Sequence, residues 1–173
     1  MFPPLPGGVL RRPAFLCAVL VLAACAGGRR PILIGLTGPF SQPRGVSMRH
    51  AAQLAADEIN AAGGIHGRRL QFVVADDSGS EDQAIRIAKA FSDSAGLVAV
   101  VGHLSSNTTL AAGRVYGAGA NPLLMISPSA SSPDLTGFSP YLFRVTPNDL
   151  NQGQQIARFA RRALGAGDRK SVV

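Results

Sequence analysis

The sequence has few cysteines, and this shortage excludes two kinds of site. It contains two cysteines in 173 residues. One of them, Cys17, lies in an apolar N-terminal run that we interpret as part of a cleaved export signal. Cys25 would then be the only cysteine of the mature chain. A single cysteine can form neither an intrachain disulfide nor a cysteine-based metal site.

Lysine is also scarce, although the chain is basic. Only two of the 17 basic residues are lysines, and the formal net charge is +7. The arginines are dispersed, and their largest cluster is Arg158, Arg161 and Arg162. No basic stripe is interleaved with aromatic residues, and no nucleic-acid-binding module is recognisable. The charge therefore predicts a solvated basic surface and no nucleic-acid partner.

Several catalytic and cofactor-binding motifs are missing. The sequence has neither a G-x-S-x-G elbow nor a G-x-G-x-x-G turn after a strand. Its three histidines, His50, His66 and His103, share no metal-ligand spacing, which favours a structural role for each. The pair Asp76-Asp77 ends a predicted strand, and a solvated turn explains it better than a magnesium site does. We expect a protein that is not an enzyme, with no cofactor and no metal.

The N-terminal residues predict export and a lipid anchor. Arg11 and Arg12 precede an apolar run at residues 14–22, which is too short to span a bilayer as a mature helix. The run ends in the sequence LAAC, which resembles a bacterial lipobox. The resemblance implies cleavage before Cys25 and a diacylglyceryl group on its thiol. An ordinary secretory signal with an incidental cysteine is the alternative.

From Pro31 onward, predicted strands alternate with predicted helices. The helix after the second strand begins with a capping box, in which Ser80 is the cap and Gln83 the third helical residue. Apolar runs predict strands at residues 32–36, 70–75, 97–101, 123–126 and 141–145, and the third is expected to be buried on both faces. Apolar periodicity predicts helices at residues 46–62, from 81 to near 96, from about 106, and at 148–164. Repeated units of this size predict an α/β fold with a Rossmann-like parallel sheet flanked by helices.

The segment 97–109 (LVAVVGHLSSNTT) is the most informative in the chain. A buried-strand pattern ends at Gly102, and a cluster of hydroxyl side chains then opens the next helix. Helix N-termini present backbone N–H groups and partial positive charge, so such a position can receive a carboxylate. The simpler alternative is that Ser106 only caps its own helix.

Residues 59–67 (INAAGGIHG) resemble the periplasmic branched-chain amino-acid-binding proteins of ABC transporters. Further landmarks of that family occur in order: Gly38-Pro39, Asp76-Asp77, Gly102-His103-Leu104, Met125-Ile126-Ser127-Pro128, Asp134-Leu135-Thr136 and Phe143-Arg144-Val145-Thr146. The resemblance implies the type I periplasmic-binding-protein fold, in which two α/β lobes close over a small solute. It also implies the strand order 2-1-3-4-5 for the first lobe.

The resemblance divides the chain into four segments. Residues 1–24 would be a lipoprotein signal peptide, 25–30 a tether, and 31–146 the N-terminal ligand-binding lobe. Residues 147–173 would hold a crossover helix and the start of a second lobe. Because Ser171-Val172-Val173 reads as the beginning of a strand, we expect the chain to be a fragment that is truncated after the first lobe.

The same resemblance assigns ligand contacts. Ser106 matches the serine whose hydroxyl and backbone N–H take the α-carboxylate, and Thr108 lies in the same segment. Ser129 and Ser131 match positions that take the α-ammonium, and the N–H of Ser131 would also serve the carboxylate. Arg44 falls where the family often has a tyrosine that lines the side-chain pocket. It would either favour an acidic or polar solute or point to solvent.

The predicted function is the extracytoplasmic solute-binding component of an ABC transporter. The protein would capture an amino acid, branched-chain or similar, and deliver it to the permease subunits. It would sit in the periplasm or cell envelope, attached to a bacterial membrane through its lipid anchor. The alternative function is a ligand-sensing module of the same fold that is coupled to a receptor or regulator.

Overall fold

The computed structural model describes residues 29–165. The predicted signal peptide, the lipid-anchor residue Cys25 and the predicted strand start at residues 171–173 lie outside this range.

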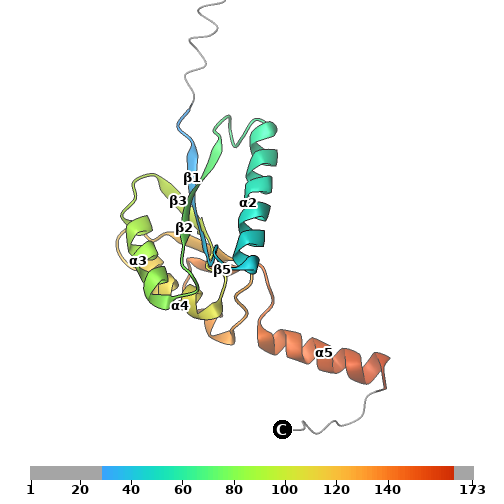
Figure 1. Cartoon of the computed structure of the whole chain (residues 1–173). Helices are drawn as coiled ribbons and strands as arrows, with labels where there is room; N and C mark the ends of the chain where they lie inside the picture. The colour runs from blue at the N-terminus through green and yellow to red at the C-terminus, as the bar shows by residue number, and fades with distance from the viewer. Residues whose placement is uncertain (1–28, 166–173) are drawn as a thin grey trace, which may run out of the picture.

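Five parallel strands form one sheet in the order β2-β1-β3-β4-β5 (Figure 1). This order confirms the arrangement that the family resemblance implied, and the parallel α/β sheet predicted from the sequence is also confirmed. The order reverses beside β1, because the chain first adds β2 on one side of it and then β3 on the other. The strands are β1 (Ile32–Gly38), β2 (Leu70–Asp76), β3 (Leu97–Val101), β4 (Leu124–Ser127) and β5 (Leu142–Arg144).

Helices lie on both faces of the sheet. Helix α2 (Pro43–Ala61) covers β1 and β2 on one face, while α3 (Glu81–Ser92) and α4 (Ser106–Tyr116) pack together on the other (Figure 1). A short 3₁₀ helix, η1 (Pro133–Leu135), lies between β4 and β5. Helix α5 (Asp149–Ala163) follows β5 and projects away from the sheet.

The hydrophobic core lies between the sheet and the α3–α4 pair. Ala84, Ile87 and Phe91 of α3 pack with Val100 of β3 and Met125 of β4. Gly35 in β1 allows this packing, because a Cβ there would come within 2.6 Å of the Phe91 ring. Burial of these side chains is the main stabilising contribution, at about 25 cal/mol for each square ångström of apolar surface.

Two helix starts show how the local sequence sets the boundaries. The predicted capping box of α3 is confirmed, because the Ser80 side chain accepts a hydrogen bond from the backbone N–H of Gln83. Helix α2 begins at Pro43, three residues before the predicted start at residue 46. Proline fits the first helical position because its missing N–H would have no intrahelical partner there.

On the sheet face that carries α2, strands β3 and β5 are only partly covered by the described residues. Phe143 is 49% exposed on β5 and Val98 is 53% exposed on β3. The prediction that the third strand is buried on both faces is therefore wrong for Val98. The pairing register of β1 with β3 shifts at this point, so Val98 bulges out of the ladder.

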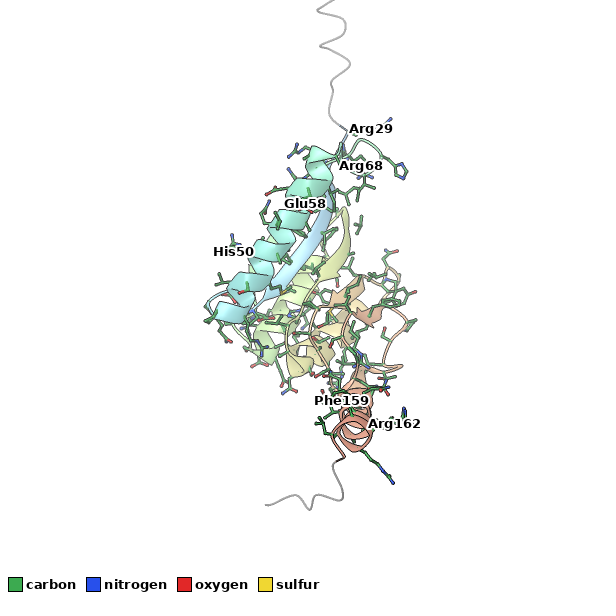
Figure 2. The ribbon with its side chains drawn as sticks, turned by 90° about the vertical axis from the view of Figure 1, so that its right-hand side faces the viewer. Arg29, His50, Glu58, Arg68, Phe159 and Arg162 are labelled. Carbon is green, nitrogen blue, oxygen red and sulfur yellow. The ribbon has the colours of Figure 1, made fainter. Side chains whose placement is uncertain are left out.

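Helix α5 has no buried residue, although it is amphipathic. Its apolar side chains Leu150, Ile156 and Phe159 are 62–68% exposed. Figure 2 shows Phe159 and Arg162 on α5 at the end of the molecule opposite to Arg29 and Arg68. Nothing within residues 29–165 therefore buries the apolar side of this helix.

Candidate functional site

The carboxyl ends of the strands form one edge, and the predicted ligand-binding residues lie along it. The β1–α2 loop, the β3–α4 loop and the loop after β4 all start from this edge. In open α/β sheets, ligands bind at such an edge, where the strand order reverses. In this sheet the reversal lies between β1 and β3, beside the N-terminus of α4.

Ser105, and not Ser106, caps helix α4. The backbone of Ser105 is extended, and its side chain accepts a hydrogen bond from the N–H of Thr108. The alternative in which Ser106 only caps its own helix is therefore wrong. Ser106 is the first helical residue, and its Oγ accepts a hydrogen bond of 3.1 Å from the N–H of Ser132. The hydroxyl proton of Ser106 thus remains available for donation.

The loop after β4 is tied to the start of α4 by two further contacts. Ser129 Oγ donates a hydrogen bond of 2.7 Å to the carbonyl of Leu104. Ser127 Oγ donates one of 2.6 Å to the carbonyl of His103. The structure therefore brings Ser106, at the start of α4, close to the loop after β4 that carries Ser129.

The other predicted ligand-binding residues lie along the same edge and differ in burial and in hydrogen bonding. Ser131 is half-buried, and its carbonyl accepts a hydrogen bond from the N–H of Asp149 at the start of α5. Thr108 is buried, and its hydroxyl is hydrogen-bonded to Ser105. Arg44 is exposed on the first turn of α2.

A buried histidine–aspartate pair, which the sequence patterns did not predict, lies behind these loops. His103 Nδ1 is 2.6 Å from Asp77 Oδ2, and both side chains are fully buried. The solvated turn expected at Asp76-Asp77 is therefore wrong for Asp77. The structural role predicted for His103 agrees with this contact. The sequence signal was the position of both residues directly after strands, but their pairing becomes visible only once the strand order is known.

Asp76 holds the neighbouring β1–α2 loop through hydrogen bonds. Asp76 Oδ1 accepts hydrogen bonds from the N–H groups of Phe40 and Ser78, which ties the β1–α2 loop to the end of β2.

The ring of Tyr116 lies 6.2 Å from that of His103. Burial, together with the nearby Asp77 carboxylate, raises the pKa of the Tyr116 hydroxyl, so the phenol stays neutral.

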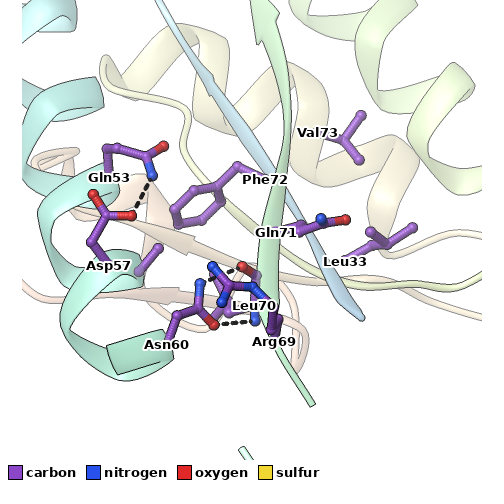
Figure 3. A pocket seen from close by; sticks show the side chains of 10 residues that line it. Leu33, Gln53, Asp57, Asn60, Arg69, Leu70, Gln71, Phe72 and Val73 are labelled. Carbon is purple, nitrogen blue, oxygen red and sulfur yellow. Dashed lines mark hydrogen bonds between the residues drawn. The ribbon is translucent and has the colours of Figure 1, made fainter. Parts of the chain in front are cut away.

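A cavity of about 380 Å³ lies away from this edge, between α2 and the amino-terminal half of β2 (Figure 3). Its lining includes Asn60, whose side chain donates to the carbonyl of Leu70 and accepts from the N–H of the same residue. Asn60 therefore pins the end of α2 to the first residue of β2. This contact gives the 59–67 motif a structural role.

The described part of the chain gives no sign of a metal cluster or a membrane-spanning helix. Among residues 29–165, no three histidine, cysteine or acidic side chains gather as a metal would require. No helix in the same range combines the length and apolar character needed to cross a bilayer.

Comparison with known proteins identifies relatives of this fold. The chain is 35% identical to the Leu/Ile/Val-binding protein of Escherichia coli (strain K12) over 158 residues, which cover 87% of this chain and 41% of that protein. An ABC transporter substrate-binding protein from Desulfitobacterium hafniense, solved in complex with Leu, superposes with a TM-score of 0.70 at 36% identity. That match covers 78% of this chain and 39% of the other.

A second solved structure agrees. The branched-chain amino acid transporter substrate binding protein of Streptococcus pneumoniae, in complex with isoleucine, matches with a TM-score of 0.69 at 34% identity, over 79% of this chain and 39% of that one. The chain thus spans about two fifths of the length of these relatives. A family model described as "Periplasmic binding protein" matches residues 31–173. On this match and this fold, the chain belongs to the periplasmic binding protein family.

Proposed function

We propose that this chain forms the N-terminal lobe of an amino-acid-binding protein that serves an ABC transporter. The main support is the geometry of the two loops that meet beside the strand-order reversal, where Ser132 N–H donates to Ser106 Oγ and Ser129 Oγ donates to Leu104. The leucine and isoleucine bound to the relatives support an amino acid as the solute.

The hydrogen-bonding state of the two serines suits the two ends of an amino acid. Ser106 Oγ already accepts a hydrogen bond, so its proton is free to be donated to a carboxylate. The Ser129 hydroxyl already donates, so its lone pairs are free to accept from an ammonium group. The positive end of the α4 dipole adds to the attraction for the carboxylate. This pattern favours a zwitterion over a simple anion.

Three further residues complete the proposed site. The N–H of Ser131 would donate to the same carboxylate, since the carbonyl of this residue is occupied by Asp149. Arg44 is exposed at the start of α2 and would meet the solute side chain or remain in solvent. Thr108 would contribute from the first turn of α4, where its hydroxyl now bonds Ser105.

The proposal extends to location and partners. Cleavage before Cys25 and lipidation of its thiol would place the lobe outside the cytoplasm, in the periplasm or cell envelope and attached to a membrane. The solute would be enclosed by a second lobe and passed to the ABC permease. In this account the protein performs no catalysis and needs no cofactor. The boundary between the lobe and the crossover helix would lie at residue 147, just before the exposed helix α5.

Leucine binding by variants of the chain tests the site. Replacing Ser106→Ala removes a hydrogen bond to a charged group, worth about 1.5–3 kcal/mol, so the Kd for L-leucine should rise about tenfold or more. L-leucinamide, which lacks the carboxylate, should bind weakly to both forms and show no dependence on Ser106. NMR titration at millimolar ligand measures the weak affinity expected of a single lobe.

Ser94→Ala is the matched control. Ser94 lies just beyond the end of α3 and is exposed, and its hydroxyl donates to the carbonyl of Ala90 in that helix. This residue lies before β3, at the opposite edge of the sheet, so leucine affinity should stay unchanged. Equal leucine affinities for the Ser106→Ala variant and the unmodified chain would refute the proposed carboxylate contact.

A further inference from the structure

Three strand ends are joined by the Asp77–His103 pair. Asp77 follows β2, His103 follows β3, and β1 lies between these two strands. The His103 Nδ1 is 2.6 Å from Asp77 Oδ2 and 3.5 Å from the hydroxyl of Thr37 in β1. The N–H of Asp77 donates to the carbonyl of Gly38, the last residue of β1. The imidazole is therefore fixed from the side of β1 and β2.

The backbone of His103 bonds the segments that carry the proposed solute site. Its carbonyl accepts hydrogen bonds from Ser127 Oγ at 2.6 Å and from Thr109 Oγ1 at 3.0 Å. The next carbonyl, that of Leu104, accepts from Ser129 Oγ. One dipeptide thus supports the first turn of α4 and the loop after β4. These are the two segments that carry Ser106 and Ser129.

We propose that His103, held by the Asp77 carboxylate, is a positioning residue that sets the spacing between Ser106 and Ser129 without touching the solute. This inference rests on the proposed function and adds a residue pair to its site. Because a carboxylate only accepts, His103 donates through Nδ1. A buried, charge-assisted hydrogen bond of this length is stronger than a neutral one, so it fixes the ring and the backbone attached to it.

Neither Thr37 nor Tyr116 holds the imidazole of His103 as Asp77 does. The hydroxyl of Thr37 is 3.5 Å from Nδ1, at the limit of a hydrogen bond. Tyr116 packs beside the imidazole with its ring centroid 6.2 Å away, and no hydrogen bond joins the two side chains among the described residues. Only the Asp77 contact combines charge with a short distance.

Asp77→Asn is the most direct test, because it keeps the shape of the side chain and removes its charge. The amide oxygen can still accept from Nδ1, but this neutral hydrogen bond is about half as strong. The amide NH2 then faces the N–H of Gly79, which in the unmodified chain donates to Asp77 Oδ1 at 2.9 Å, so that second bond is lost. We expect the backbone amide signals of Leu104, Ser106 and Ser129 to shift in the ligand-free chain, and the Kd for L-leucine to rise at least threefold. Long-range ¹H–¹⁵N spectra should show the Nδ1–H tautomer in the unmodified chain.

His103→Asn and His103→Leu separate positioning from general stability. An asparagine amide can place its nitrogen near the former Nδ1 and donate to Asp77, so it should keep leucine affinity within about threefold. Leucine removes the donor to Asp77 Oδ2 and leaves the buried carboxylate with only the bond from the N–H of Gly79 to Oδ1, which is destabilising. If the His103→Leu variant does not fold, the Asp77→Asn and His103→Asn variants still decide the question.

Tyr116→Phe is the matched control from the same buried cluster. It removes a hydroxyl for which the described residues provide no partner, so leucine affinity should stay within twofold even if the free energy of unfolding changes. Unchanged amide signals at Ser106 and Ser129 in the Asp77→Asn variant would overturn the positioning role. If the unmodified chain binds no leucine, the proposed function fails, while the ligand-free amide shifts still test the positioning role.

Discussion

At the scale of single residues, two adjacent serines have different roles. Ser105 has an extended backbone and caps α4, while Ser106 lies inside the first turn and bonds the neighbouring loop. The sequence predicted a helix start within this hydroxyl cluster. It could not assign the cap, because that assignment depends on which residue leaves the helical conformation, and several residues in the segment 105–109 have side chains able to cap.

The different roles of Ser105 and Ser106 should appear in the free energies of unfolding of their alanine variants. Ser105→Ala removes the acceptor for the N–H of Thr108 and should lower the free energy of unfolding by about 1 kcal/mol. Ser106→Ala should cost less than half of that, because its hydroxyl bonds a loop N–H near solvent. Urea denaturation measures both values. An equal loss for the two variants would contradict the assignment of Ser105 as the cap.

At the scale of elements, the sequence predicted every strand and α-helix of the described residues but not the 3₁₀ helix η1, and the other errors lie at the boundaries and in burial. Predicted strand and helix positions agree with the observed ones to within a few residues. Burial of Val98 could not be predicted, because a bulge in the β1–β3 register decides it. The start of α2 at Pro43 depends on contacts that the apolar periodicity of the helix does not report.

One such contact involves Gly45 in the first turn of α2. A Cβ at this position would overlap the carbonyl oxygen of Pro39. Gly45→Ala should therefore push the first turn away from β1 and lower the free energy of unfolding by about 1–3 kcal/mol, as overpacking does. Urea denaturation measures the loss.

Gly153→Ala, in helix α5, is the matched control for Gly45→Ala. Nothing lies within 4 Å of a Cβ at position 153 in α5, so alanine should raise the helicity of α5 by its intrinsic preference of about 1 kcal/mol over glycine. Circular dichroism and Cα chemical shifts report this change. A loss of α5 helicity in the variant would show that Gly153 has a packing role in the chain.

Helix α5 should be the least protected helix of the described residues. It buries no side chain, and an isolated helix of 15 residues is marginal in water. We expect its amides to exchange with solvent far faster than those of α4, which packs against the core. Hydrogen exchange followed by NMR compares the two. Equal protection would mean that α5 is covered in solution.

At the scale of the whole molecule, the sequence placed the candidate ligand-binding residues at one edge of the sheet but did not predict the buried pair behind them. Asp77 and His103 are 26 residues apart, and β1 separates their strands in the sheet. Their pairing depends on strand order and register, which no local pattern encodes. The serines were easier to place, because each lies within a few residues of the end of a strand.

The lipid anchor is a second prediction about the whole molecule. Expressed in a bacterium that processes lipoproteins, the chain should incorporate labelled palmitate and move to the membrane fraction. Cys25→Ser should abolish the labelling, because it removes the thiol that carries the diacylglyceryl group. Cys17→Ser, inside the predicted signal, should leave it intact. Labelling that persists in the Cys25→Ser variant would contradict the anchor.

Residue-resolved NMR mapping of L-leucine on the ¹⁵N-labelled chain tests the proposed solute site most directly. We expect the largest changes at the amides of Ser106, Asn107 and Ser131, at the carboxyl edge of the sheet. The amides of Asn60 and Leu70, beside the cavity between α2 and β2, should change little. Changes centred on Asn60 and Leu70, with Ser106 and Ser131 unmoved, would contradict the proposed site.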